Sequence, residues 1–389
     1  MNTNRSEPQG RGARILFRVI LIALGVALLY VADRAAKRVY PRFAPPAGQR
    51  AVAALRSGEQ NAESGFFVEH PYLFYTFRPN MVAFDQSQFN ARAHRSPEIA
   101  DHPAPGVVRI LCIGGSTTAS FPYVPNREDA WPGKLEQILR EKTGQTIEVI
   151  NAGLTSGNSA DFLAHYVFRN RYLGAQLVVL HIGGNDGIAL FFDNYSPEYT
   201  HYTKGWQNTG ISARPFERQL LNSALVRWLY AIWLRNATLE SAIGRENIAT
   251  ESPEQAFANV QKNQPDGFRR NLTLLLRTIR EDGAEPVLFP FVWAPDERFR
   301  RDKTFSRYHD ALLLSFQKDR AVMAELSESM KVPSYILPQD AIEPGMFKDW
   351  CHLNADGDAI KARFLAEKLE PAVRALQAKL HEATTSTAP

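Results

Sequence analysis

The chain has 389 residues, of which 44% are hydrophobic and 22% charged, so a disordered or collagen-like protein is excluded. Its net charge of +4 is too small to predict a nucleic-acid partner. The two cysteines, Cys112 and Cys351, are too few for a disulfide scaffold or a cysteine-rich zinc site.

An apolar segment at 15–32 follows a polar tail at 1–14 and is just long enough to cross a bilayer as a helix. Arg18 can snorkel to the headgroups at one end, and Tyr30 suits the interface at the other. We therefore expect a single-pass membrane anchor, with a cleaved signal peptide and a buried core helix as the alternatives. Basic residues flank both ends, so charge leaves the orientation open. The domain that follows the anchor is expected outside the cytoplasm, in the periplasm, because a lone N-terminal anchor is the usual way to export one.

Prolines occur repeatedly among polar residues in 33–104, and this pattern predicts a stalk followed by irregular or short β structure packed onto the main domain. From Val107 onward, short apolar runs alternate with amphipathic segments. Runs that are apolar at consecutive positions indicate strands buried on both faces, and helical crossovers between them indicate a parallel sheet. The region 105–380 is thus predicted to be a three-layer α/β/α domain. Its expected strands are 107–113, 146–150, 176–182, 286–292 and 332–337, and its expected helices lie near 128–142, 159–172, 266–282, 306–331 and 355–380.

Residues 188–264 interrupt this alternation and are too many for a structureless loop, so we expect an insertion with helices of its own. Its apolar segment 220–234 is too short to span a bilayer and is interpreted as a helix packed on the main domain, or else as an interfacial helix lying on the membrane. The residues 381–389 are expected to be a disordered tail. Aromatic rings of the insertion either form its own small core or rim a substrate site; they are Phe191, Phe192, Tyr195, Tyr199, Tyr202, Trp206 and Phe216.

Ligand sites of open parallel sheets lie beyond the carboxyl ends of the strands, and four loops there carry polar or glycine-rich signals. They are Gly114-Gly115-Ser116-Thr117-Thr118, Asn151-Ala152-Gly153, Gly183-Gly184-Asn185-Asp186-Gly187 and Asp349-Trp350-Cys351-His352. Each one taken singly is also a plain turn or cap signal. Together they supply every part that an acyl-transfer site requires.

Serine needs a histidine base to become a nucleophile, and that base needs a carboxylate to orient it. Ser116, His352 and Asp349 fit these three roles. Asp349 and His352 are three residues apart on one turn, so their side chains can face the same way. The oxyanion formed on an ester carbonyl needs preorganised donors. The backbone N–H groups of Ser116 and Gly153 and the side-chain amide of Asn185 are the expected donors.

These segments resemble the sequence blocks of the SGNH (GDSL-type) hydrolase superfamily over about 107–187 and 265–375. Ser116, Gly153, Asn185 and His352 fall on the four residues that name it, and Asp349 on the triad acid. The resemblance implies a flavodoxin-like sheet of five parallel strands in the order 2-1-3-4-5, and serine esterase, lipase or acyltransferase activity without a metal. The family's Gly-Asp-Ser-Leu reads here as Gly-Gly-Ser-Thr, which leaves the triad intact but weakens assignment to a subfamily.

Motifs for other chemistries are missing: the chain has no Gly-x-Ser-x-Gly elbow, no Gly-x-Gly-x-x-Gly, no Walker lysine loop and no His-Glu-x-x-His. Cys351 is interpreted as a packing residue rather than a thiol nucleophile, and no cofactor or metal is expected. The sequence predicts an esterase that removes acyl groups, small ones such as acetyl, from an envelope glycan or a lipid. The alternatives are an O-acyltransferase acting on carbohydrate and a non-catalytic glycan-binding or scaffold protein on the same fold.

Overall fold

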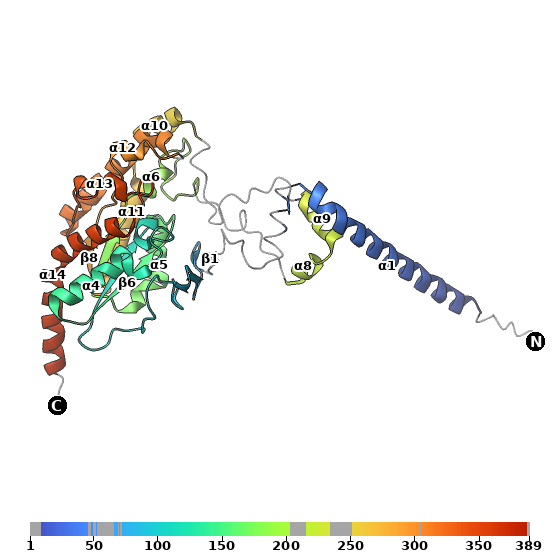
Figure 1. Ribbon diagram of the computed structural model, residues 1–389, viewed down its shortest axis with the longest axis horizontal. Helices are drawn as coiled ribbons and strands as arrows, with labels where there is room; N and C mark the ends of the chain where they lie inside the picture. Colours follow the sequence, from blue (N-terminus) through green and yellow to red (C-terminus); the bar gives the residue numbers. More distant parts are fainter. Residues whose placement is uncertain are drawn as a thin grey trace, which may run out of the picture. The chain divides into compact units, whose positions relative to one another are not determined.

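The computed structural model describes residues 9–45, 48–49, 52, 66–68, 70, 72–202, 215–233, 251–303 and 305–386. The chain divides into two compact units (Figure 1). One comprises Met1–Gly65 with Gly205–Gly244, and the other comprises Phe66–Lys204 with Arg245–Pro389. The expected insertion at 188–264 is therefore shared between the two units.

The larger unit is built on a parallel sheet whose strands are β5 (Val108–Gly114), β6 (Ile147–Gly153), β7 (Leu177–His181) and β8 (Glu285–Leu288). The strand order is β6-β5-β7-β8, which equals 2-1-3-4 in chain order. All residues of β5 and β7 are buried, as expected for strands covered on both faces.

The fifth predicted strand, 332–337, is not formed as a strand among the described residues. Ser334 makes an isolated parallel bridge to Leu288, and Tyr335 and Pro333 exchange backbone hydrogen bonds with the same residue. Pro333 lies within this segment and Pro338 follows it, and neither has the N–H group that a longer ladder needs. The sheet therefore ends in a bridge rather than in a fifth strand.

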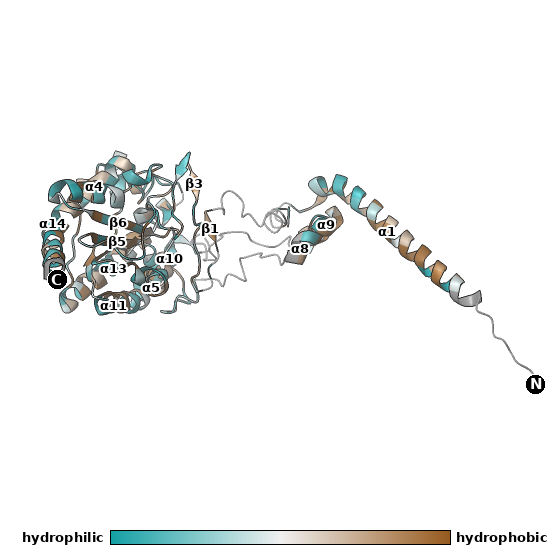
Figure 2. Cartoon of the chain, turned by 90° about the horizontal axis from the view of Figure 1, so that it is seen from below, coloured by the Kyte–Doolittle hydropathy of each residue, from teal (hydrophilic) through white to brown (hydrophobic). Residues whose placement is uncertain are grey.

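Helices cover both faces of the sheet, and Figure 2 shows it edge-on between two helical layers. On one face α4 and α14 pack together, and on the other α11 packs against α5 and α13. The helix α5 begins with a capping box, in which Asn158 and Asp161 satisfy each other's backbone N–H groups. These five helices are α4 (Trp131–Thr143), α5 (Ser159–Phe168), α11 (Asp266–Glu281), α13 (His309–Met330) and α14 (Ala355–Ser386). Because α14 continues to Ser386, most of the tail expected to be disordered is helical.

Shorter elements complete this unit. Two small antiparallel pairs, β1 with β2 and β3 with β4, precede the sheet, as the prediction of short β structure in 33–104 anticipates. Their bounds, with those of the short helices, are β1 (Phe67–Val68), β2 (Thr76–Phe77), β3 (Val82–Ala83), β4 (Gln86–Ser87), α3 (Ser116–Ala119), α6 (Asp186–Ala189), α10 (Pro253–Lys262) and α12 (Asp296–Phe299).

The smaller unit contains α1 (Gln9–Phe43), α8 (Pro215–Leu220) and α9 (Ala224–Trp233). The helix α1 includes the apolar segment 15–32 and is long and apolar enough to cross a membrane. Its apolar side chains from Ile15 to Val31 are exposed. It is thus a candidate membrane span or signal sequence.

The register of the sheet brings three loops to one edge. Gly114 at the end of β5 lies opposite Gly153 of β6 and opposite His181 of β7. The segments that follow these strands therefore leave the sheet at the same level.

Candidate active site

Ser116 is the first residue of α3, directly after β5. A Cβ on Gly114 would lie 2.2 Å from Thr118 Oγ1 and 2.3 Å from the His181 carbonyl oxygen, so this turn accepts no side chain there. A Cβ on Gly115 would lie 3.1 Å from the Asn185 amide nitrogen. The two glycines thus allow a tight turn that presents the Ser116 hydroxyl at the sheet edge.

His352 lies in the loop before α14, and Asp349 organises that loop. Asp349 Oδ1 accepts hydrogen bonds from the backbone N–H groups of Cys351, at 2.9 Å, and of His352, at 2.7 Å. Its other oxygen, Oδ2, lies 2.6 Å from His352 Nδ1. The same carboxylate therefore shapes the turn and orients the imidazole.

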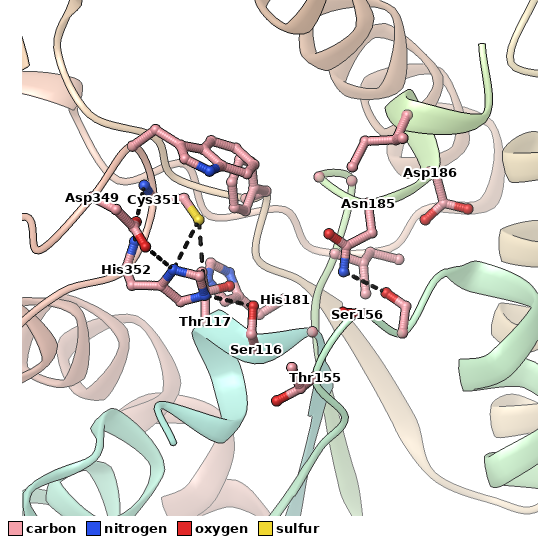
Figure 3. A pocket seen from close by; sticks show the side chains of 18 of the residues that line it. Ser116, Thr117, Thr155, Ser156, His181, Asn185, Asp186, Asp349, Cys351 and His352 are labelled. Carbon is pink, nitrogen blue, oxygen red and sulfur yellow. Dashed lines mark hydrogen bonds and ion pairs between the residues drawn. The ribbon is translucent and has the colours of Figure 1, made fainter. Parts of the chain in front are cut away.

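The imidazole links this loop to Ser116, because His352 Nε2 lies 2.7 Å from Ser116 Oγ (Figure 3). A carboxylate only accepts hydrogen bonds, so Nδ1 carries the proton and donates to Asp349. Nε2 is then left as the acceptor for the Ser116 hydroxyl. The structure thus brings together the three residues that the sequence predicted for the triad.

Hydrogen bonds to Asp349 favour its ionised form despite its burial. Burial by itself raises the pKa of Asp349, but the hydrogen bonds from His352 and from the two backbone N–H groups outweigh it and hold the pKa below its usual value. Tyr123 stacks on the His352 ring, with 3.8 Å between centroids and 10° between planes. Burial and the nearby Asp349 charge raise the pKa of Tyr123, so its hydroxyl stays neutral. These contacts hold the imidazole plane in one orientation.

Asp349, Cys351 and His352 also form a group of possible metal ligands within the described residues, with atoms within 4.8 Å of one another. Burial raises the pKa of the Cys351 thiol well above its usual value, so the sulfur is held as a thiol rather than the thiolate that metals bind. The other two side chains are engaged with each other. The chemistry of this group suits proton transfer better than metal binding.

The Ser116 hydroxyl opens onto a cavity of about 280 Å³ that lies between the loops after β5, β6 and β7 and the loop of His352. Ser116 is partly exposed, so substrate can reach it. Most of the wall is apolar or aromatic; the rings that line it, apart from the two histidines His181 and His352, belong to Phe121, Tyr123, Phe162, Phe291, Phe305 and Trp350. The sequence interpretation missed these rings, which come from five separated stretches of the chain.

Five of the seven aromatic residues of the expected insertion lie outside the lining of this cavity. Phe191, Phe192, Tyr199 and Tyr202 are buried in the main core, and Tyr195 packs against it. They therefore form neither a separate small core nor a substrate rim. Phe216 belongs to the smaller unit, and Trp206 lies outside the described residues.

Two of the expected oxyanion donors are at the cavity. Ser116 begins α3, where the first N–H groups of a helix have no intrahelical acceptor. The side-chain amide of Asn185 lines the cavity and donates one of its two hydrogens to the Gly157 carbonyl at 2.8 Å. Its second hydrogen remains for a ligand.

Gly153, the third expected donor, is not brought to the cavity. It is the last residue of β6, and its N–H donates to the side chain of Asn151 at 3.0 Å. Gly157, four residues later, lines the cavity instead, and a Cβ there would lie 2.6 Å from the Phe162 ring. Its own N–H donates to the Leu154 carbonyl at 2.9 Å. The prediction took the glycine at the end of the strand, whereas the glycine that lines the cavity ends the following turn.

A buried ion pair on α14 contacts α3, the helix that begins with Ser116. Lys361 donates to the Thr117 carbonyl at 2.9 Å and lies 3.4 Å from Asp358, and each side chain is 2% exposed. Asp358 in turn accepts from the Ser120 hydroxyl and, at 3.1 Å, from the Trp131 N–H. This pair therefore joins α3, which begins with Ser116, to the helix that follows His352. Asp358 and Lys361 were not among the residues predicted for the site.

The segment before the sheet supports the site from another side. Arg95 is buried and donates to the Ala119 carbonyl at 2.7 Å, at the end of α3. The hydroxyl of Tyr75 donates to the Thr155 carbonyl, in the loop that lines the cavity. The segment before the sheet thus helps to hold the loops of the site in place.

No protein-family model matches the chain, and no curated protein matches it in sequence. Solved structures to which it is similar include an inhibitor-bound aryl esterase from M. smegmatis, a carbohydrate acetylesterase from Sinorhizobium meliloti and a GDSL-like lipase from Bacteroides thetaiotaomicron. Each is 14% identical and aligns over 68% of this chain, and the alignments cover 99%, 99% and 88% of those chains, with TM-scores of 0.40, 0.36 and 0.37.

Proposed function

We propose that the chain is a serine esterase that hydrolyses small O-acyl esters, such as acetyl esters, carried by an envelope glycan or a lipid. The observation that carries the proposal is the hydrogen-bonded series from Asp349 through His352 to Ser116 at the wall of an open cavity. In this arrangement His352 Nε2 takes the hydroxyl proton as Ser116 Oγ attacks the ester carbonyl, and Asp349 stabilises the imidazolium that forms. The imidazolium then returns the proton to the departing alcohol.

The oxyanion that forms on the carbonyl is stabilised by the Ser116 N–H and the free amide hydrogen of Asn185. Water then attacks the acyl-enzyme, with His352 as the base, and releases the acid. A cavity of about 280 Å³ holds a short acyl group with part of its alcohol and lies below the usual range for drug-sized ligands. This size is why a small acyl group is proposed.

The test is labelling with a fluorophosphonate probe, which reacts with activated serines. The wild-type chain should become labelled, Ser116→Ala should not, and Ser156→Ala serves as the matched control because Ser156 also lines the cavity. A folded wild-type protein that stays unlabelled, or Ser116→Ala that labels equally, would overturn the proposal. Hydrolysis of p-nitrophenyl acetate, butyrate and octanoate should decrease with acyl length, and added oligosaccharide acceptor should not accelerate release of p-nitrophenol.

We also propose that α1 anchors the chain in a membrane with the larger unit on the periplasmic side. The exposed apolar side chains of α1 from Ile15 to Val31 support this, because such a surface is stable in hydrocarbon and not in water. A C-terminal alkaline phosphatase fusion should be active and a C-terminal green fluorescent protein fusion dark if the larger unit is exported. The reverse pattern would place it in the cytoplasm.

A further inference from the structure

Both faces of the His352 imidazole are covered by other side chains. The Tyr123 ring stacks on one face, with 3.8 Å between centroids and 10° between planes. The sulfur of Cys351 lies 3.4 Å from His352 Nδ1 and 3.9 Å from Nε2 (Figure 3). An atom in the ring plane at these two distances would overlap a ring carbon, so the sulfur lies over a face. Because the phenol occupies one face, the sulfur covers the opposite one.

The two covering side chains come from the two halves of the triad. Tyr123 lies in the loop after α3, the helix that begins with Ser116. Cys351 directly precedes His352 and is 4% exposed. The Tyr123 ring therefore extends from the segment of the nucleophile to the ring of the base, and the sulfur packs on the imidazole from the loop of the base itself.

The backbone around Tyr123 is fixed relative to α3. The N–H of Val124 donates to the Ser120 carbonyl at 2.8 Å. The buried guanidinium of Arg95 donates to the Ala119 carbonyl at 2.7 Å and also to the Val124 carbonyl. One buried side chain therefore joins the end of α3 to the residue after Tyr123. This joint holds the phenol ring at a set distance from the helix that carries the nucleophile.

Little of the imidazole is left open by these contacts, because the His352 side chain is only 12% exposed. Its Nδ1 lies 2.6 Å from Asp349 Oδ2, and its Nε2 lies 2.7 Å from Ser116 Oγ. A tilt of the ring out of its plane would have to displace the phenol on one side or the sulfur on the other. The hydrogen bond to Asp349 fixes the ring edge, and the two covering groups fix the ring plane.

We propose that Tyr123 is a positioning residue that sets the distance between the Ser116 hydroxyl and the His352 base, with Cys351 holding the imidazole against the phenol ring. Proton transfer requires the two atoms to stay within hydrogen-bond reach, and a displacement of about 1 Å can cost about 100-fold in rate. The face of an aromatic ring also attracts a cation, which favours the imidazolium that forms during the reaction. This inference rests on the proposed esterase function and adds two residues to its mechanism.

The experiment compares Tyr123→Leu, which removes the ring, with Tyr123→Phe, which keeps it. Tyr123→Leu should lower kcat on p-nitrophenyl acetate and the rate of fluorophosphonate labelling by about 10- to 100-fold, and Tyr123→Phe should stay within about threefold of the wild type. Tyr172→Leu, at an exposed site outside the cavity lining, is the matched control and should change neither rate. Thermal unfolding shows whether each variant is folded.

Proton NMR supplies a readout that a purely structural role of Tyr123 would not change. The low-field signal of the His352 Nδ1 proton reports its hydrogen bond to Asp349. It should be sharp in the wild type and in Tyr123→Phe, and broadened or lost in Tyr123→Leu. If Tyr123→Leu does not fold, Cys351→Ala, which uncovers the opposite face, takes its place and should lower kcat by about three- to tenfold.

A folded Tyr123→Leu variant with an unchanged signal, or with kcat within about twofold of the wild type, would overturn the inference. Tyr123→Phe as slow as Tyr123→Leu would overturn it too, because the hydroxyl rather than the ring would then matter. Where Cys351→Ala replaces Tyr123→Leu, an unchanged kcat has the same meaning. The NMR signal needs no substrate, so a wild-type chain that the probe leaves unlabelled refutes the esterase while the positioning of His352 is still measured.

Discussion

Replacing Asp349 with asparagine tests the orientation of the triad without removing the turn that holds it. Asp349 Oδ1 accepts two backbone hydrogen bonds, at 2.9 and 2.7 Å, and an asparagine carbonyl oxygen can take both. The amide nitrogen must then stand in the position of Oδ2, 2.6 Å from His352 Nδ1. Two donors cannot face each other, so the imidazole proton moves to Nε2, which then donates to Ser116 Oγ and cannot accept its proton.

We expect Asp349→Asn to lower kcat by about 10⁴, which corresponds to about 5.5 kcal/mol of transition-state stabilisation. Initial rates on p-nitrophenyl acetate and the rate of fluorophosphonate labelling measure the loss, and thermal unfolding shows that the fold is retained. Asp340→Asn, an exposed carboxylate earlier in the same segment, should change neither rate. A folded Asp349→Asn variant with less than about a tenfold loss would refute the assignment of the histidine tautomer.

Further substitutions test the oxyanion donor, the buried ion pair and the buried histidines. Asn185→Ala should lower kcat by about 10² to 10³ with a smaller change in KM, measured by steady-state kinetics. Lys361→Met should lower the free energy of unfolding by about 3 to 5 kcal/mol in denaturant titrations, because it leaves the Asp358 carboxylate buried without its cation, and adding Asp358→Asn should restore much of the loss. Burial lowers the pKa of His94 and of His165 to about 3, so the folded state keeps both neutral while the unfolded state binds protons below about pH 6.5. Stability should therefore decrease as the pH falls, by about 2 to 3 kcal/mol per histidine between pH 8 and pH 4.5, and His94→Gln and His165→Gln should each flatten that dependence; an unchanged slope would contradict the reasoning.

Local patterns predicted the strands and helices of the sheet because each depends on a few adjacent residues. The strands β5, β6 and β7 are rich in apolar residues, with consecutive apolar runs in β5 and β7, and each expected helix has an apolar face. The loops after parallel strands meet at one edge by the geometry of the sheet, so Ser116 and Asn185 could be placed in one site from the sequence. Asp349 and His352 could be paired because three residues separate them.

Contacts between distant parts of the chain were out of reach of that reasoning. Gly153 ends β6 and Gly157 follows it by four residues, and only the packed turn shows that Gly157 lines the cavity. The fifth strand is reduced to a bridge at Ser334, because Pro333 beside it has no N–H group for a ladder and Pro338 follows directly after the predicted strand. The pair of Asp358 and Lys361 gives no signal in the sequence, because its role is defined by the α3 turn more than 230 residues away.

The sequence by itself determined which segments are apolar, which alternate as helix and strand, and which residue types are present for acyl transfer, because these properties belong to neighbouring residues. Tertiary structure alone decided which donors reach the cavity, which rings line it, and that the apolar helix α9 packs beside α1. The physical reason is that these outcomes depend on free energies of packing and hydrogen bonding between groups far apart in the chain, which no local pattern encodes.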